Sequence, residues 1–123
     1  MSWLDETLAD FGRRIGVGPL SFGDKGFVQM SLSQGGMLGA SHAGDEVRLW
    51  LSRPLSHHQR SALERALAEC DFRRGGAFAL QAGLRGEDEL VLLARIPERD
   101  FTTPALEQAL DTLTRLHERA RNG

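Results

Sequence analysis

The sequence predicts a single α+β domain whose elements follow the order α-β-β-β-α-β-β-α around a twisted, mainly antiparallel sheet. Three stretches carry apolar residues at the three- and four-residue spacing of an amphipathic helix, and shorter stretches between them alternate apolar with polar residues. No helical pattern interrupts the first three strands, so they are expected to pair as an antiparallel meander. A chain of 123 residues has the length of one domain, and residues 1–123 are expected to fold as one unit.

The first expected helix follows the N-terminus directly. Ser2 and Asp5 resemble a capping box, in which a side chain accepts a hydrogen bond from a backbone N–H at the helix start. Gly16 ends the helical pattern, because glycine readily adopts the left-handed conformation found at helix ends. The apolar positions of this helix are Leu4, Leu8, Phe11 and Ile15.

Alternating residues predict three strands between residues 27 and 54. Val28, Met30 and Leu32 alternate with polar neighbours, and “QGG” at 34–36 is a turn signal. A weaker strand, “MLGASH”, follows at 37–42, and “AGD” at 43–45 turns the chain into a third strand over 47–51 that Pro54 closes. In this third strand Trp50 falls among the polar positions, which is the unexpected side for a large apolar ring.

A second helix is expected after this strand. Ser56 and Gln59 form an S-x-x-Q capping box, which places His57 and His58 in the first helical turn. “RRGG” at 73–76 ends the helical pattern. The apolar stripe of this helix is narrow and consists of Leu63, Ala66, Leu67 and Cys70.

Two strands and a last helix complete the chain. Phe78, Leu80 and Ala82 alternate with small or polar residues, and “GLRGEDE” at 83–89 is expected to turn the chain into a strand over 90–96. That strand is apolar on both faces, which is typical of a strand covered on two sides, so it is expected to lie inside the sheet. Thr103 is expected to cap the last helix, with Pro104 in its first position. The buried stripe of this helix is Leu106, Ala109, Leu110, Leu113 and Leu116.

Composition and charge argue against several classes of protein. The net charge of −2 and a pI near 6.1 offer no basic surface for nucleic acid. The N-terminus lacks the basic and apolar segments of a secretory signal, and no apolar run reaches transmembrane length, so a cytoplasmic protein is expected. The only cysteine, Cys70, cannot form a disulfide within the chain, which agrees with a reducing compartment.

No pattern in the chain indicates catalysis, a cofactor or a metal. Adjacent residues on a helix point about 100° apart, so His57 and His58 are not expected to share a metal ion. Cys70 completes an apolar stripe and is expected to be a small core residue rather than a nucleophile. “GVGPLSFG” at 16–23 follows a helix rather than a strand and contains a proline, unlike a phosphate-binding loop. The acidic run at 87–89 lies in an expected turn, where solvated charges are common.

Apolar surface without an obvious cover is the feature that points to function. Trp50, Val91 and Leu93 all point away from the main core set, and three helices do not easily cover both faces of a five-stranded sheet. A partner chain is the economical explanation for this surplus. The alternative is that the second helix covers Trp50 within the monomer.

Residues across nearly the whole chain carry a resemblance to a known family. They are Met1, Ser2 and Trp3, then “LWL” at 49–51 with Arg53, Leu55 and His58, and in the C-terminal part Gly76, Ala77, Leu80, Ala82, Gly83, Gly86, Glu87, Leu90, Val91, Leu92, Glu98, Arg99, Thr102, Pro104, Leu106, Gln108, Ala109, Arg115 and Leu116. Together with the order of elements, they resemble the class I chaperones of type III secretion, small acidic proteins that act as dimers. Within that class the match is closest to the SycN family.

The resemblance implies a chaperone with no enzymatic activity and no cofactor. Members of the SycN family pair with a YscB-like subunit and escort a YopN-like gatekeeper protein, whose N-terminal region they keep competent for export. Such a chaperone is cytoplasmic and can associate peripherally with the secretion apparatus at the inner membrane. The alternative function is a homodimeric adaptor or ligand-binding domain unconnected with secretion.

The resemblance also implies where partners bind. The second helix and the strand after it are expected to form the dimer contact, and the expected interface residues are Trp50, Leu63, Ala66, Leu67, Phe78 and Leu80. The client segment is expected to run extended along the first helix and the first strands, where apolar patches and sheet edges can hold it. The expected client-binding residues are Trp3, Val28, Met30 and Met37.

Overall fold

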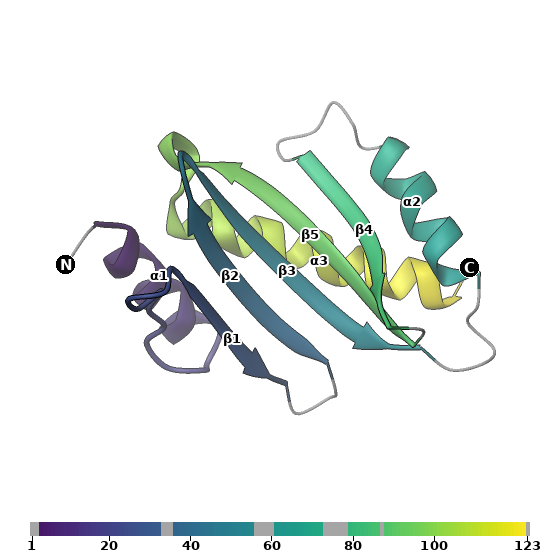
Figure 1. Ribbon diagram of the computed structural model, residues 1–123, viewed down its shortest axis with the longest axis horizontal. Helices are drawn as coiled ribbons and strands as arrows, with labels where there is room; N and C mark the ends of the chain where they lie inside the picture. Colours follow the sequence, from purple (N-terminus) through teal and green to yellow (C-terminus); the bar gives the residue numbers. More distant parts are fainter. Residues whose placement is uncertain (1–2, 33–35, 56–60, 73–78, 87, 123) are drawn as a thin grey trace.

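The structure is a computed structural model that describes residues 3–32, 36–55, 61–72, 79–86 and 88–122 (Figure 1). Within these residues the chain forms three α-helices, five strands and a short 3-10 helix, and the predicted order of helices and strands is confirmed. The helices are α1 (Trp3–Arg14), α2 (Ala62–Phe72), η2 (Glu98–Asp100) and α3 (Thr103–Asn122). The strands are β1 (Phe27–Ser31), β2 (Met37–Ala43), β3 (Glu46–Pro54), β4 (Ala79–Arg85) and β5 (Glu89–Pro97).

The five strands form one sheet in the order β1-β2-β3-β5-β4, and every neighbouring pair is antiparallel. The first three strands pair consecutively as the predicted meander. The strand β5 lies between β3 and β4, which confirms that it lies inside the sheet. The two edge strands are therefore β1 and β4, at opposite sides of the sheet (Figure 1).

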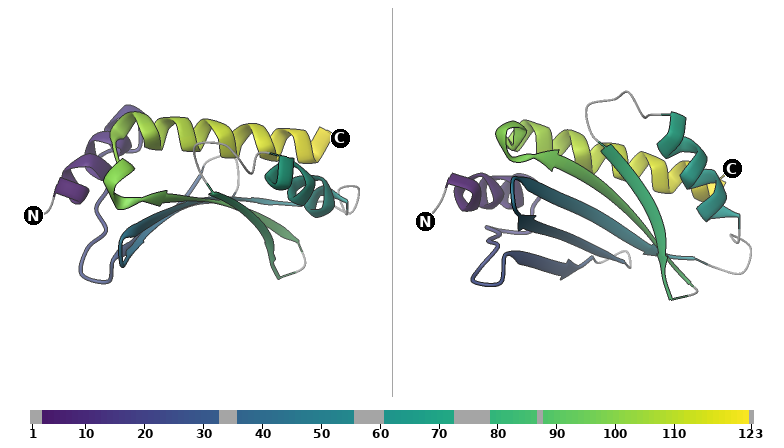
Figure 2. Two further views of the ribbon diagram at one scale, coloured as in Figure 1. Left: turned by 90° about the horizontal axis from the view of Figure 1, so that it is seen from above. Right: turned by 45° about the horizontal axis from the view of Figure 1, so that its top comes forward.

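All three α-helices lie on the same side of the sheet, and the other side carries no helix of the described chain (Figure 2). The long helix α3 runs across β3 and β5, while α1 packs on α3 and α2 packs on α3 and β4. Alternation along each strand buries one set of side chains under these helices. The core comprises Leu4, Leu8, Phe11, Leu38, Val47, Leu49, Leu51, Ala62, Ala66, Leu90, Leu92, Ala94, Ile96, Phe101, Leu106, Ala109, Leu113 and Leu116.

The cap of α3 lies one residue earlier than the sequence predicts. The Oγ1 atom of Thr102 accepts a hydrogen bond of 3.2 Å from the backbone N–H of Ala105, so Thr102 is the capping residue and Thr103 already belongs to the helix. Consequently Pro104 occupies the second helical position rather than the first, where its missing N–H is still tolerated. The capping residues expected for the other helices, Ser2 and the pair Ser56 and Gln59, lie outside the described residues.

His117 links the covering helix α3 to the central strand β3. Its side chain is fully buried, and its Nε2 atom lies 2.7 Å from the carbonyl oxygen of Leu51. Because a carbonyl can only accept, the proton of the neutral ring lies on Nε2. The pKa of His117 is lowered to about 4, chiefly by burial and also by the nearby positive charges of Arg53 and Arg121, against the raising effect of the Leu51 hydrogen bond. The ring is therefore neutral at pH 7.

Candidate protein-binding surfaces

The side of the sheet opposite the helices, which we call the open face, carries apolar residues at its centre. Trp50 of β3 pairs with Leu93 of β5, and Val91 follows two residues away on the same face. All three are partly exposed, and the prediction that they point away from the main core is confirmed. The alternative that α2 covers Trp50 is wrong, because α2 packs on the other side of the sheet (Figure 2). For the same reason the described chain covers β5 on one side only, not on two.

Trp50 lies against the backbone of the neighbouring strand β2. Its register partner there is Gly39, and a Cβ atom placed on Gly39 would fall 2.1 Å from Cε2 of the indole. Glycine is thus required at this position, because any side chain would collide with the ring. The Nε1 atom of Trp50 is buried by this packing and has no hydrogen-bond acceptor among the described residues.

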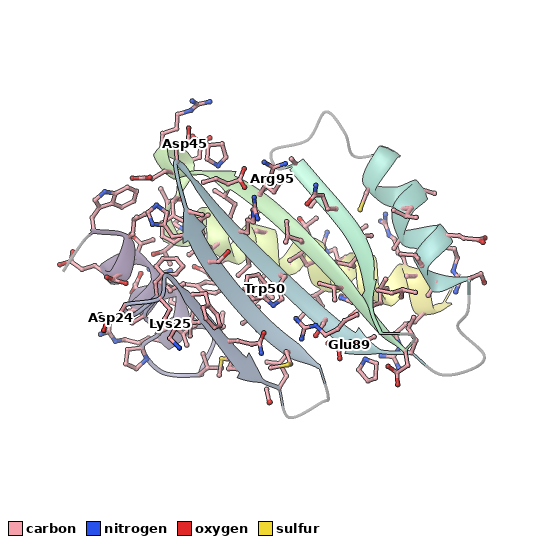
Figure 3. The ribbon with its side chains drawn as sticks, viewed as in Figure 1. Asp24, Lys25, Asp45, Trp50, Glu89 and Arg95 are labelled. Atoms are coloured by element: carbon pink, nitrogen blue, oxygen red, sulfur yellow. The ribbon has the colours of Figure 1, made fainter. Side chains whose placement is uncertain are left out.

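Charged residues close one end of the open face. Glu46 accepts hydrogen bonds of 2.9 Å from Nε of Arg95 and 2.8 Å from Nε of Arg48. The pKa of Glu46 is lowered first by the hydrogen bond from Arg95 and secondly by that from Arg48. The hydrogen bond between Arg95 and Glu46 also raises the pKa of Arg95. Two guanidinium groups therefore share one carboxylate, which leaves one positive charge in excess beside Trp50. In Figure 3 the open face is toward the viewer, and Trp50 lies between Arg95 and Glu89.

The opposite end of the open face is electrically balanced. Glu89 lies 3.7 Å from Nη1 of Arg85, the neighbouring residue on β4. The Nη1 atom of Arg85 also lies 3.9 Å from the sulfur of Met37, so Met37 belongs to the open face as well. On β2, the small residues Gly39 and Ser41 flank the apolar centre. On β4, Gln81 lies opposite Leu93, with the small residues Ala79 and Gly83 on either side of it.

A second apolar surface lies where α2 meets the edge strand β4. Leu67 on α2 is 45% exposed and Leu84 near the end of β4 is 43% exposed, although both are large apolar residues. Of the other expected interface residues, Leu63 and Leu80 are partly buried against the core, and Ala66 is fully buried within the chain. Trp50 lies on the open face, away from α2. Phe78 lies outside the described residues.

Arg65 fixes the position of α2 relative to α3. Its Nε and Nη2 atoms donate to the carbonyl oxygen of Ala120, the Nε bond measuring 2.7 Å, and its Nη1 atom donates to Ser61 over 2.7 Å. A cation suits the C-terminal end of α3, where carbonyl groups lack partners within the helix. This contact holds α2 with Leu67 directed away from the core.

Two further exposed aromatic residues lie on different faces: Trp3 begins α1 on the helix side, and Phe27 begins the edge strand β1 and points to the open face. Trp3 is 50% exposed and packs on Phe101 with ring centres 6.1 Å apart, and Phe27 on β1 is 48% exposed. Trp3 also forms one wall of an open cleft of about 380 Å³. The other walls of that cleft are Asp45, Pro97, Glu98 and Arg99.

The four expected client-binding residues do not form one patch. Trp3 lies on α1, and Met37 lies on the open face. Val28 and Met30 point to the helix side, where they line a cavity of about 10 Å³ that holds no more than a water molecule. A client side chain can therefore reach Trp3 directly, whereas Val28 and Met30 would need repacking of the core to receive one.

Sequence patterns missed two of the exposed apolar residues. Leu84 falls in “GLRGEDE”, which predicts a turn from residue 83, but β4 continues to Arg85. Phe27 begins β1 and faces the opposite way from Val28, so the apolar alternation of that strand does not include it. For Leu84, a strand that ends later than expected changes the interpretation of the side chain, and for Phe27 the cause is its position on the face opposite Val28.

The structure offers no arrangement for metal binding within the described ranges. No three His, Cys, Asp or Glu side chains are grouped there as ligands, and His57 and His58 lie outside those ranges. Cys70 is buried on α2, as the apolar stripe predicts. Among the described residues, no helix has the length and apolar character needed to cross a membrane.

Three solved structures have a similar fold. A chain of the HopA1–SchA chaperone–effector complex matches with a TM-score of 0.71 and 22% identity, over 96% of this chain and 92% of that one. A chain of the ExsC–ExsE complex matches with a TM-score of 0.70 and 18% identity, over 98% and 92%. The Yersinia pestis type III secretion chaperone SycH, solved with a fragment of YscM2, matches with a TM-score of 0.65 and 12% identity, over 95% and 98%. The fold is that of the type III secretion chaperones.

Sequence comparison identifies the family. The model of the type III secretory system chaperone SycN family matches residues 3–120. The chaperone protein SycN of Yersinia enterocolitica is 36% identical over 119 residues, and that of Yersinia pseudotuberculosis serotype I (strain IP32953) is 35% identical over 119 residues, each alignment covering 96% of both chains. The chain belongs to the SycN family of type III secretion chaperones, and the predicted resemblance is confirmed. Membership sets aside the alternative of a domain unconnected with secretion.

Proposed function

We propose that this chaperone is one subunit of a heterodimer. It pairs with a YscB-like subunit through α2 and β4 and holds the N-terminal region of a YopN-like gatekeeper protein in an export-competent state. Its activity is binding and requires no catalysis or cofactor. The heterodimer acts in the cytoplasm and associates peripherally with the secretion apparatus at the inner membrane.

One observation carries the assignment of two separate sites. Among the described residues, the four exposed large apolar side chains lie in two separate regions of the molecule. Leu67 and Leu84 lie where α2 meets the edge strand β4, whereas Phe27 lies on the edge strand β1 and Trp3 lies on α1 beside the open cleft. Exposed apolar side chains next to an unpaired strand edge suit a partner that combines backbone pairing with side-chain burial.

The β4 side suits a folded subunit. Arg65 anchors α2 on α3, so a contact within the chain sets the position of the helix that carries Leu67. A firm apolar helix next to a strand edge resembles the core of a dimer interface. Of the residues expected there, Leu67 is available at the surface, and Leu63 and Leu80 are partly so; Ala66 would support the interface from within the chain.

The β1 side suits an extended client segment. Trp3 stands beside an open cleft, and the unpaired edge of β1 can extend the sheet by one strand. Chaperones and effectors are present together in the similar HopA1–SchA complex, which supports a client for this chain too. Of the four client-binding residues expected from the sequence, Trp3 is the one that this site includes most directly.

Separating the two sites by mutation tests the proposal. The chain is co-expressed with the YscB-like subunit, and pairing and client binding are measured by titration calorimetry with purified client N-terminal segment. Leu67→Ser is expected to weaken subunit pairing, whereas Trp3→Ser leaves pairing intact and weakens client binding by roughly thirtyfold, as truncation of an interface tryptophan commonly does. Ala68→Ser, an exposed neighbour on α2, tests whether a change near Leu67 acts through its apolar side chain. Equal effects of Leu67→Ser and Trp3→Ser on both affinities would contradict two separate sites.

A further inference from the structure

The helix α2 packs on the rest of the chain mainly through small side chains. Among its described side chains, Ala62 and Ala66 are fully buried and Cys70 is 9% exposed, while Leu63 packs only partly against the core. The buried stripes of α1 and α3 are built mainly from leucine instead. Small residues form shallow ridges, so apolar packing alone fixes the rotation of α2 about its own axis only weakly.

Arg65 supplies a directional contact that the small side chains do not. Its Nε and Nη2 atoms donate to the carbonyl oxygen of Ala120, and its Nη1 atom donates to Ser61, which directly precedes α2. Ala120 lies 55 positions later, in the last turn of α3, and is only 1% exposed. The planar guanidinium therefore joins two helices and fixes both the distance and the direction between them.

Arg65 and Leu67 lie on opposite flanks of the buried stripe. Each is one residue away from the buried Ala66, and successive residues of an α-helix are rotated by about 100°, so the two side chains project to different sides. A roll of about 20° would displace a side chain that lies about 5 to 6 Å from the helix axis by about 2 Å, which is more than a hydrogen bond tolerates. The bonds to α3 therefore also fix the direction in which Leu67 leaves the helix.

The contacts of Arg65 depend on geometry rather than on ion pairing. A guanidinium has five N–H groups, and three of those on Arg65 have acceptors within the chain. The acceptors are a carbonyl and a hydroxyl, which are both neutral, although the end of α3 carries a partial negative charge. A lysine at this position would keep the positive charge but not the fork of donors.

We propose that Arg65 is a positioning residue for subunit pairing, which clamps α2 to the last turn of α3 and thereby sets the place of Leu67. The end of α3 then takes part in pairing without touching the partner. This role rests on the proposed function, in which α2 and β4 pair with a YscB-like subunit. Arg65 acts on the partner only through the orientation of α2.

Subunit exchange measures the effect of Arg65 on pairing. The full chain, as wild type or variant, is co-expressed with the YscB-like subunit, and the purified heterodimer is challenged with fluorescently labelled wild-type chain. The ratio of the two chains in the exchanged complex gives their relative affinities. Arg65→Gln is expected to weaken pairing by about tenfold, and Arg65→Lys by at least about threefold, because neither side chain can bridge both acceptors.

Two controls separate positioning from stability and from direct contact. Thr102→Ala weakens the other end of α3 and is expected to change pairing less than twofold, since a loss of global stability alone does not move α2. The effect of Arg65→Gln is expected to be the same at about 50 and 500 mM salt, because the acceptors of Arg65 are neutral. Circular dichroism confirms that each variant retains its fold.

A double-mutant cycle tests whether Arg65 acts through Leu67. Once Leu67→Ser has removed the apolar side chain, adding Arg65→Gln is expected to weaken pairing by less than about a further twofold. Independent, multiplicative effects of the two substitutions would overturn the positioning role.

Three further results would contradict the role of Arg65. Full affinity in Arg65→Lys, or an effect of Arg65→Gln that fades with salt, would mean that the charge contacts the partner directly. Unchanged pairing in Arg65→Gln, alongside weakened pairing in Leu67→Ser, would refute the positioning role and leave the pairing site intact. Unchanged pairing in Leu67→Ser would refute the pairing site itself, and with it the role of Arg65.

Discussion

The two faces of the sheet have nearly the same apolar character on β5 but differ in what the chain does with them. Leu90, Leu92 and Ile96 are fully buried under the helices, while Val91 and Leu93, between them in sequence, remain partly exposed. The difference follows from the connections, which place all three α-helices on one side. A strand that is apolar on both faces is therefore not evidence that its own chain covers both faces. One of the two faces can instead present a surface for another protein.

Neighbouring leucines on β5 allow the sharpest test of this contrast. Leu92→Ala is expected to lower the free energy of unfolding by about 2 to 5 kcal/mol, because it leaves a cavity in the core. Leu93→Ala removes the same atoms from the open face and is expected to cost less than about 1 kcal/mol. Urea denaturation measures both variants. Losses of equal size would mean that the open face is packed as tightly as the core.

Acid should weaken the covered face selectively through His117. The pKa of His117 is about 4 in the folded chain, compared with about 6.5 when unfolded, so the unfolded chain binds more protons between these values. The stability contributed by the neutral ring is complete above pH 6.5 and is lost as the pH falls toward 4, by roughly 3 kcal/mol. His117→Gln keeps a donor for Leu51 but does not titrate. Between pH 6.5 and 4, the free energy of unfolding of His117→Gln should therefore fall by about 3 kcal/mol less than that of the wild type. An equal fall in both proteins would contradict the burial of a neutral ring.

Gly39→Ala probes the packing of the open face. The added methyl group collides with the Trp50 ring, and such overpacking typically costs about 1 to 3 kcal/mol. In a Trp3→Phe background, Trp50 emission should also shift to longer wavelength as the indole moves into water. Gly83→Ala is the matched control, because a Cβ there meets no atom within 4 Å. An unchanged emission spectrum in Gly39→Ala would show that Trp50 does not lie on this glycine.

The smallest expected effect concerns the start of the covering helix. Thr102→Ala removes the cap of α3 and is expected to cost about 1 kcal/mol. Thr103→Ala, within the helix, should cost less than about 0.5 kcal/mol. Thermal unfolding followed by circular dichroism compares the two. A larger loss of stability in Thr103→Ala than in Thr102→Ala would mean that Thr103 caps the helix, as the sequence pattern predicts.

Local patterns predict the elements of this fold because each helix and strand has its own periodicity. The order of elements, the meander and the interior position of β5 all follow from that information. The side on which α2 packs does not, since β5 is apolar on both faces and can be covered on either. The position of a cap is similarly undetermined when two threonines, Thr102 and Thr103, stand side by side.

The surfaces are harder to predict because they depend on register between strands. Gly39 lies beneath Trp50 only because β2 and β3 pair in one register, and “MLGASH” has no alternation that would specify it. Likewise, the network of Arg48 and Arg95 on Glu46 joins residues that are almost fifty positions apart in sequence. The interface and client residues named from the sequence stay predictions, and the structure separates Trp50 from the α2 surface with which they were grouped.

The position of Trp50 on Gly39 has an entropic consequence for association. Packing on the strand backbone restricts rotation about the side-chain torsions of Trp50, so its rotamer is selected when the chain folds. Ordering a mobile side chain at an interface costs about 0.5 to 1.5 kcal/mol, and that cost does not recur when a chain docks on a ring already held in place. A chain that docked on this ring would change mainly the hydration of its outer surface, and a substitution that frees the ring, such as Gly39→Ala, is expected to weaken such docking without removing a contacting atom.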